Sequence, residues 1–293
     1  MMPDLRPEHL VTSLAQLGTR AMLYEVAVNP KPGLVDPVSS GPHPDMDVFL
    51  FIDSATSLTP YLVDCATAGS QFRDAALPKL FQQLRPLGQN AEREMFRTTH
   101  DVNTHKGAIF SLGILVAVTA HQITVDNNYS LKQVIAMTKE MLSGLTQNDF
   151  KSLANKPKET LTAGERQFVH YGKTGIRGEA EAGFPTVTEM ALPFLRQRSG
   201  TIMARLLDTL IQIAGNTDDS NLIKRAGDSQ ITAWMHEQAE HYFALGGSQT
   251  VAGRHFLEAL NQTFITRNLS LGGSADLLIL TIYLALLDGT LSA

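Results

Sequence analysis

The most constraining feature of this chain is an apolar segment near its C-terminal end. Between Ser274 and Leu287, leucine, isoleucine and alanine occupy nearly every side of a helix. A helix on the surface of a protein keeps a polar face, whereas one that is apolar all round is buried among other elements. The segment is also shorter than the roughly 20 residues that a membrane span needs. It therefore predicts a central helix in a multi-helical bundle.

The remainder of the chain also has a helical pattern. Apolar residues recur at helical spacing, and sustained alternation typical of strands is missing. We predict helices over residues 11–28, 46–68, 75–99, 104–119, 131–142, 163–171, 187–196, 202–214, 229–245, 248–266 and 274–287. Pro60 and Pro86 are expected to interrupt the second and third helices. The polar segment 148–165 is expected to be a surface excursion. Because no linker divides the chain, the prediction is one all-α domain over residues 1–293.

Charge and cysteine content exclude several classes of protein. The net charge is −5, and neither half of the chain is basic, so nucleic-acid binding has no support. Cys65 is the sole cysteine, which excludes intramolecular disulfides and sites with several cysteine ligands, and fits a reducing compartment. The polar N-terminus is unlike a signal peptide. We expect a soluble cytoplasmic protein without a membrane span.

Polar and glycine-rich residues gather in a few segments between or at the ends of the predicted helices. Each segment has an ordinary structural interpretation: a stiff turn around Lys31, helix caps at Asp45 and Asp276, and charge pairing between Arg177 and its neighbouring glutamates. Together they instead favour one polar cleft for a polyphosphate ligand with Mg²⁺. The segments are residues 29–36, 41–47, 98–107, 175–183 and 267–276, with a smaller cluster at 218–225.

Several motifs in these segments resemble those of the triphosphoribosyl-dephospho-CoA synthase family. The motifs occur in the order of the family and span most of the chain. The stretch LTAGERQFVHYGKTGIRGEAEAG from residue 161 is closer to the citrate lyase branch than to the malonate decarboxylase branch. The matching motifs are EVAVNPKPGLVD from Glu25, HPDM from His43, NTHKGAIFSLG from Asn103, RGEAEAGFP from Arg177 and NLSLGGSADLL from Asn268.

The resemblance implies an all-helical fold and a pentosyl transfer. The 2′-hydroxyl of 3′-dephospho-CoA would attack C1 of the ATP ribose, adenine would leave, and a separate transferase would attach the product to the acyl carrier subunit of the lyase. Cleavage of the ribose–adenine bond needs a carboxylate, an acid and a base, and the triphosphate needs cations and Mg²⁺. Our candidates for catalysis are Glu179, Glu181, His105 and Asp276. Our candidates for substrate binding are Lys31, Asn103, Thr104, Lys106, Arg177, Arg225, Arg267, Gly272, Gly273 and Ser274, and those for Mg²⁺ are Asp45 and Asp219.

Two departures from the family pattern leave alternatives open. Leu271 stands where the family usually has proline, and Ala226 stands where it often has glycine. The alternatives are the same reaction in the service of malonate decarboxylase, a non-catalytic nucleotide- or CoA-binding protein of this fold, and a Mg²⁺-dependent ADP-ribose hydrolase. The sequence leaves the oligomeric state open. We further expect Lys31, Arg177 and Asp276 to line one cleft.

Overall fold

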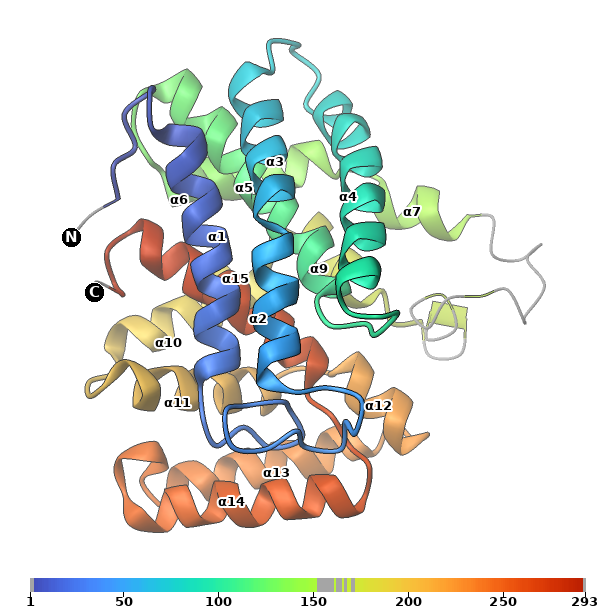
Figure 1. The fold of residues 1–293 in the computed structure, drawn as a ribbon, viewed down its shortest axis with the longest axis vertical. Coiled ribbons are helices and arrows are strands. Elements are labelled where there is room, and N and C mark those ends of the chain that lie inside the picture. The colour runs from blue at the N-terminus through green and yellow to red at the C-terminus, as the bar shows by residue number, and fades with distance from the viewer. Residues whose placement is uncertain (1–2, 152–160, 162–164, 166–167, 170–171, 292–293) are drawn as a thin grey trace.

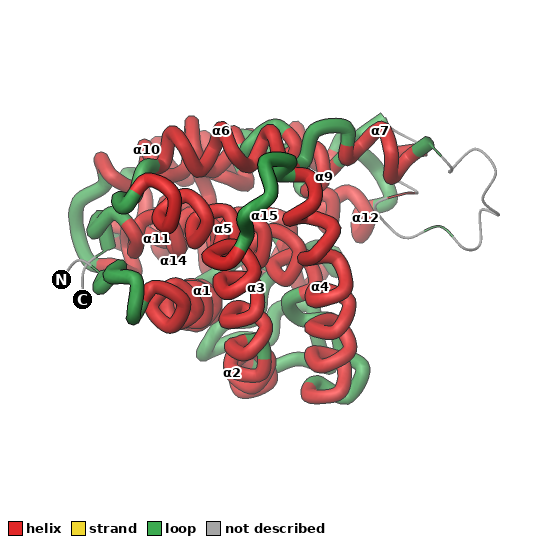
Figure 2. The backbone as a smooth tube through the Cα atoms, turned by 90° about the horizontal axis from the view of Figure 1, so that it is seen from above, coloured by secondary structure: helices red, strands yellow, loops and turns green. Residues whose placement is uncertain are grey.

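The structure is a computed structural model that describes residues 3–151, 161, 165, 168–169 and 172–291. Within these residues every regular element is helical, and Figure 2 shows the helices in red and no strand. The all-α prediction is therefore confirmed. The elements are α1 (Leu10–Ala27), α2 (Val48–Ser57), α3 (Thr59–Gln71), α4 (Pro78–Thr98), α5 (Lys106–Asp126), α6 (Leu131–Met141), α7 (Leu145–Phe150), α9 (Gly175–Glu181), the π-helix η3 (Thr186–Ala191), α10 (Leu192–Gln197), α11 (Ile202–Ala214), α12 (Ser220–Ala226), α13 (Ile231–Ala244), the 3₁₀ turn η4 (Gly247–Gln249), α14 (Val251–Thr266) and α15 (Gly272–Leu287).

Two apolar helices form the centre of the molecule. The C-terminal helix α15 packs against α1, α5, α11 and η3, and every residue from Leu277 to Leu287 is buried. The predicted central position of this helix is confirmed (Figure 1). Its neighbour α5 is long and apolar enough to cross a membrane, but 83% of the apolar stretch is buried inside the protein. Burial on all sides gives α5 the character of a core helix.

The two prolines expected to interrupt helices have different outcomes. Pro60 lies in the first turn of α3, where its missing N–H has no helical partner to lose, and the helix predicted over residues 46–68 is split into α2 and α3. Pro86 lies inside α4, which continues from Pro78 to Thr98, so the predicted break there is wrong. Pro86 and Gln82, whose carbonyl loses its partner, are both exposed, and water can hydrogen-bond that carbonyl.

Short helices are the elements that the sequence pattern did not predict. The helices α7, α9 and α12 have six or seven residues each, too few for apolar periodicity to be visible. The helix predicted over residues 187–196 is present, but it begins as the π-helix η3 and continues as α10. The helix predicted over residues 163–171 and the excursion at 148–165 fall largely outside the described residues.

The segment between α1 and α2 is an ordered loop that packs under both helices (Figure 1). Asp36 is buried and accepts hydrogen bonds from the backbone N–H groups of Lys31, at 3.0 Å, and of Ser39, at 2.8 Å. Asn261 of α14 accepts the N–H of Gly33 at 3.0 Å. Gly33 has a φ of +69°, and a Cβ there would lie 2.2 Å from the ring of Phe264. Glycine at this position therefore allows the loop to lie close against α14.

Candidate functional site

A polar cavity of about 290 Å³, which we call the α5–α15 cavity, lies where the first turns of α5 and α15 meet the loop after α1. It brings together residues that are up to about 250 positions apart in sequence. Of the predicted site residues, Lys31, Asn103, Thr104, His105, Lys106, Arg225, Gly272 and Asp276 line it. Other polar residues in its lining are Glu25, His43, Asn221, Lys224 and Ser270.

Asp276 contributes a carboxyl group to this cavity from the second turn of α15. Its side chain packs against Gly107 so closely that a Cβ on Gly107 would lie 1.8 Å from Oδ2, and it accepts a hydrogen bond from the N–H of Ala108 in the first turn of α5. Burial, together with the nearby charges of Asp219 and Glu25, raises the pKa of Asp276 to about 8. A carboxyl group that titrates near neutral pH in a cavity is characteristic of functional sites, because it is able to exchange protons there.

Asp219 does not fit the predicted role of a metal ligand, because N–H and O–H donors already occupy its carboxylate. It caps α12, where Oδ1 accepts the N–H of Asn221 at 2.8 Å. It also accepts the N–H of Gly273, and its Oδ2 accepts the N–H and Oγ–H of Ser274 at 2.7 and 2.8 Å. The N-terminus of α15, predicted to hold phosphate through Gly273 and Ser274, therefore holds the protein's own carboxylate. Burial raises the pKa of Asp219, and the hydrogen bonds that its carboxylate accepts partly lower it again.

His105 is buried at the N-terminus of α5. Its Nδ1 lies 2.8 Å from the hydroxyl of Ser54, which also lies 2.7 Å from the hydroxyl of Thr104. The edge of the imidazole packs against the ring of Phe51. Burial, aided by the charge of Lys31, lowers the pKa of His105 to about 3. The imidazole is therefore neutral near pH 7, which does not suit an acid that must donate a proton to adenine.

Lys31 is buried, with 1% of its surface exposed, and its ammonium group is held by Glu25 of α1. Nζ lies 2.8 Å from the backbone oxygen of Glu25 and 2.5 Å from its Oε1. Lysine and glutamate are almost never buried unless they are paired. The pair therefore holds the loop after α1 against the end of that helix. Two of the three N–H donors of the Lys31 ammonium group are used in hydrogen bonds to Glu25.

The remaining cations of the cavity differ in how firmly they are held. Arg225 donates to the backbone oxygen of Pro42 at 3.1 Å and to Asn268 at 2.7 Å, and its Nη2 lies 2.9 Å from Nδ1 of His43. Lys106 forms an ion pair of 2.8 Å with Glu92 of α4 and remains half-exposed. Lys224 is exposed at the rim. These three side chains are the cations that a bound phosphate could reach without unfolding the loop.

Eight predicted residues lie outside the lining of the α5–α15 cavity: Gly273, Ser274 and Asp219, described above, and Glu179, Glu181, Arg267, Asp45 and Arg177. Both glutamates accept backbone N–H groups at helix starts: Glu179 that of Thr186 at 3.3 Å, and Glu181 those of Gly144 and Thr146 at 2.8 and 3.1 Å. Arg267 stacks over Trp234. Asp45 is exposed beyond the cavity.

The expectation that Arg177 shares a cleft with Lys31 and Asp276 is wrong. Arg177 lines a separate cavity and donates from Nε to Asp149 at 2.9 Å. The physical reason is that α9, which carries Arg177, packs beside α5, α6 and α7, whereas the cavity with Lys31 and Asp276 lies at the ends of α1 and α15. Within the described residues no group of three or more His, Cys, Asp or Glu side chains could hold a metal ion.

Sequence reasoning missed several residues of the cavity, above all Glu25 and Lys224. Glu25 had a detectable signal, because it lies on the buried face of α1, where a charge is costly unless it is paired. Lys224 belongs to the polar cluster at 218–225, but one turn of helix separates it from Asn221, and only the presence of α12 makes both point to one side.

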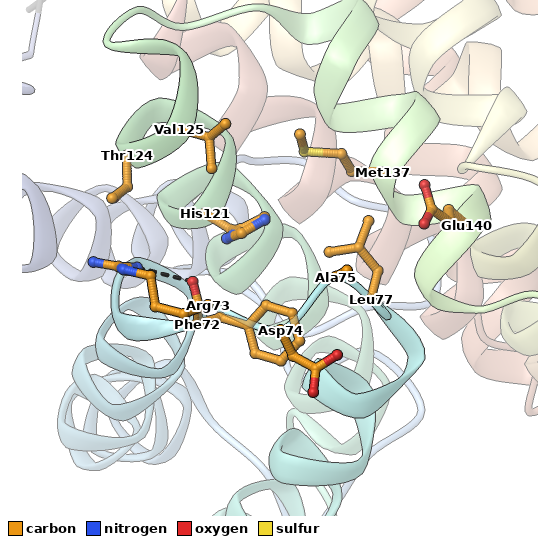
Figure 3. Close-up of a pocket in the computed structure, with 10 residues that line it drawn as sticks. All are labelled: Phe72, Arg73, Asp74, Ala75, Leu77, His121, Thr124, Val125, Met137 and Glu140. Atoms are coloured by element: carbon orange, nitrogen blue, oxygen red, sulfur yellow. Dashed lines mark hydrogen bonds between the residues drawn. The ribbon is translucent and has the colours of Figure 1, made fainter.

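A further cavity, of about 490 Å³, lies at the other end of α5, between the α3–α4 connection and α6 (Figure 3). It is lined by Phe72, Arg73, His121, Met137 and Glu140 among others, and by none of the predicted site residues. In contrast, the α5–α15 cavity gathers three accessible cations and a carboxyl group of raised pKa. The side chains suited to bind an anion and to exchange a proton therefore lie at the N-terminal end of α5.

Comparison with known proteins gives a consistent result. The profile of the family described as CitG: ATP:dephospho-CoA triphosphoribosyl transferase matches residues 11–293. A probable 2-(5″-triphosphoribosyl)-3′-dephosphocoenzyme-A synthase of Lactiplantibacillus plantarum is 57% identical over 267 residues, which cover 91% of this chain and 94% of that protein. A protein of the same name from Streptococcus pyogenes serotype M3 is 39% identical over 295 residues, covering 95% and 98%. Protein CitXG of Leuconostoc mesenteroides subsp. cremoris is 49% identical over 288 residues, covering 97% of this chain and 61% of that longer protein. No solved structure matches the chain.

The fold is all-helical, and its α5–α15 cavity is lined by accessible cations and by a carboxyl group of raised pKa. The family match and the identities make the assignment specific. The chain belongs to the ATP:dephospho-CoA triphosphoribosyl transferase family. It is a transferase that moves the triphosphoribosyl group of ATP to dephospho-CoA. The resemblance seen in the sequence is thereby confirmed, and the relatives support its citrate lyase branch.

Proposed function

We propose that ATP and dephospho-CoA react in the α5–α15 cavity. The observation that carries this proposal is the meeting of three family motifs around one cavity: the motif from Asn103, the motif from Asn268 and the loop that contains Lys31. Lys106, on the motif from Asn103, also shares the cavity with Lys224 and Arg225 from a distant part of the chain, and cations exposed to a common space gain nothing for stability. A shared phosphorylated ligand explains why they lie together.

In this proposal Asp276 acts in its ionised form. Departure of adenine builds positive charge on C1 of the ribose, and a carboxylate beside that carbon stabilises the charge. The same carboxylate, with its raised pKa of about 8, has a high affinity for the proton of the attacking 2′-hydroxyl. Asp276 is therefore the candidate base and the candidate stabiliser of the reacting sugar.

The triphosphate is assigned to the accessible cations Lys106, Lys224 and Arg225. Mg²⁺ is proposed to arrive with ATP, as part of the substrate. The cavity suits such a complex, because burial and the charges of Asp219 and Glu25 raise the pKa of Asp276, and a cation beside Asp276 would offset those charges. His105 is assigned a positioning role: through Ser54 it fixes the hydroxyl of Thr104 at the cavity wall.

The product is proposed to pass to a separate transferase that attaches it to the acyl carrier subunit of citrate lyase, in the cytoplasm. The resemblance of residues 161–183 to the citrate lyase branch supports this destination over malonate decarboxylase. Both destinations need the same chemistry, so the genes that neighbour this one are the observation that separates them.

We expect adenine release from ATP and Mg²⁺ to depend on dephospho-CoA. Adenine is the leaving group of a glycosyl transfer, whereas phosphoryl transfer would yield ADP or AMP. Mass spectrometry of the reaction mixture measures all three together with the joined product. A control without dephospho-CoA identifies simple hydrolysis, in which water attacks C1 in place of the 2′-hydroxyl and adenine is released there too. Formation of ADP or AMP in place of adenine would contradict the proposal.

We expect CoA to be a poor acceptor compared with dephospho-CoA. The 3′-phosphate of CoA adjoins the 2′-hydroxyl, which must approach C1 to within about 3–3.5 Å. Its bulk and charge would also face the carboxylate of Asp276. Initial rates at equal concentrations of the two acceptors measure the preference, and a competition assay tests whether CoA binds without reacting. Equal turnover of the two acceptors would show that the cavity places the hydroxyl differently.

A further inference from the structure

A second cavity adjoins the proposed reaction site along the groove between α4 and α5. This α4–α5 cavity has a volume of about 170 Å³, and its lining includes Arg85, Glu92, Phe110 and Arg177. Glu92 forms an ion pair of 2.8 Å with Lys106, which lines the α5–α15 cavity. Phe110 follows Lys106 by one helical turn, about 6 Å along α5. The two cavities are therefore neighbours separated by one half-exposed ion pair.

Two arginines are held in fixed positions at the α4–α5 cavity. Arg85 of α4 and Arg177 of α9 each donate to one oxygen of Asp149 in α7, at 2.7 and 2.9 Å. Each guanidinium also lies over an aromatic ring, Arg85 at 4.8 Å from the centroid of Phe81 and Arg177 at 5.7 Å from that of Phe110. Stacking and pairing together restrain side chains that would otherwise be flexible.

Counted over the described residues, these arginines retain donors for a ligand. Each guanidinium has five N–H donors, and the ion pair with Asp149 uses one from each. The side chain of Arg85 is 50% exposed and that of Arg177 is 40% exposed, whereas Asp149 is only 18% exposed. The cations thus face the solvent side of the cavity, and the carboxylate lies behind them. Among the residues that the structure describes at this cavity, Glu92 is paired to Lys106 and the two arginines share one carboxylate, so a positive charge remains that an anion would balance.

The reaction supplies an anion that suits this site. It joins two nucleotides, and a cavity of about 290 Å³ is at the lower limit for even one ligand of drug size. Resting on the proposed function, we infer that the α4–α5 cavity binds the acceptor, with Arg85 and Arg177 on the 5′-diphosphate of dephospho-CoA. The apolar wall that includes Leu84, Ile109 and Ile114 favours this substrate, because its diphosphate continues into the pantetheine arm. The triphosphate of ATP ends in charged oxygens and has no apolar extension.

Two single substitutions test the assignment, Arg85→Gln and Arg177→Gln. Each is expected to raise KM for dephospho-CoA about tenfold or more, since a charged hydrogen bond is lost, and to leave KM for ATP within about twofold. Arg97→Gln is the matched control, because Arg97 is an exposed arginine on the same helix that pairs with Glu94. Lys224→Gln is the reciprocal variant, expected to raise KM for ATP instead. Thermal melting verifies that all four variants are folded.

Calorimetric titration of dephospho-CoA into the protein without ATP gives a second readout that does not need turnover. Weaker binding by Arg85→Gln and Arg177→Gln than by Arg97→Gln supports the assignment even if the wild type releases no adenine, so failure of the proposed function is distinguishable. A rise in KM for ATP in the two variants would assign these arginines to the donor and overturn the inference. Unchanged KM and unchanged binding for both substrates would overturn it as well.

Discussion

Replacing Asp276 with asparagine is expected to lower kcat by about 10²–10⁴. Asparagine keeps the shape of the side chain and can still accept the N–H of Ala108, but it carries no charge and takes up no proton. The loss should fall on kcat more than on KM for ATP, because the group acts on the sugar as charge develops there. Steady-state kinetics of adenine release measure both quantities. Normal turnover in this variant would remove Asp276 from the mechanism.

The pH dependence of the wild type tests the same role. Because the pKa of Asp276 is about 8 and the ionised form is the active one, kcat/KM for ATP should rise as pH increases from 6, reach half its maximum near pH 8 and level off at higher pH. The Asp276→Asn variant should lose this rise in its residual activity. A wild-type profile that falls as pH approaches 8 would instead assign the protonated carboxyl as an acid acting on adenine.

The free energy of unfolding provides an independent check on Asp276. Its pKa is raised in the folded state from the usual 3.8 to about 8, so the folded protein binds this proton more tightly than the unfolded chain does. The contribution of this group to stability therefore falls as pH rises from about 4 to about 8. At pH 7 the Asp276→Asn variant should melt higher than the wild type, by roughly 2–4 °C for each kcal/mol recovered. Near pH 4 the difference should disappear.

The fold was predictable wherever helices are long and carry a continuous apolar face. The burial of α15 follows from its composition alone, because no exposed position could tolerate so many leucines. The predicted break at Pro86 is absent, and the reason could not be read from the sequence. One carbonyl loses its partner there, and whether that is costly depends on its exposure, which is set by how α4 packs. Helices as short as α12 are determined by tertiary contacts rather than by their own pattern.

The candidate site was predictable in its composition but not in its geometry. Carboxylates near glycine-rich helix starts are equally suited to hold Mg²⁺ and to cap a helix, and Asp219 caps two helix starts at once. Glu179 and Glu181 are likewise consumed by neighbouring backbone N–H groups. Asp276 differs because it receives fewer hydrogen bonds and is close enough to Asp219 and Glu25 for their charges to raise its pKa. Sequence order reveals neither how deeply a carboxyl group is buried nor which charges lie near it, and burial first, then the charges of Asp219 and Glu25, raise the pKa of Asp276.

Replacing Lys31 with methionine is expected to lower the free energy of unfolding by about 3–5 kcal/mol. The substitution leaves the Glu25 carboxylate buried without its cation, and breaking a buried ion pair by removing one partner typically costs that much. The effect should therefore be on stability more than on ATP affinity, although Lys31 lines the cavity. Urea unfolding of the variant and the wild type measures it. The matched control is Lys224→Met, an exposed lysine of the same cavity, which should change stability by about 0.5 kcal/mol or less.

A double-mutant cycle separates the ion pair from the other contacts of each residue. Glu25→Gln keeps the backbone oxygen and an amide oxygen as acceptors for the ammonium group, so it should destabilise less than Lys31→Met. The double variant Lys31→Met with Glu25→Gln should regain much of the loss, because no buried charge is left unpaired. Additive effects of the two substitutions, or a Lys31→Met protein of normal stability that requires far more ATP, would mean that Lys31 serves the triphosphate. Recovery in the double variant would mean that the lysine holds the loop after α1 in place, and with it the wall of the cavity against which ATP must lie.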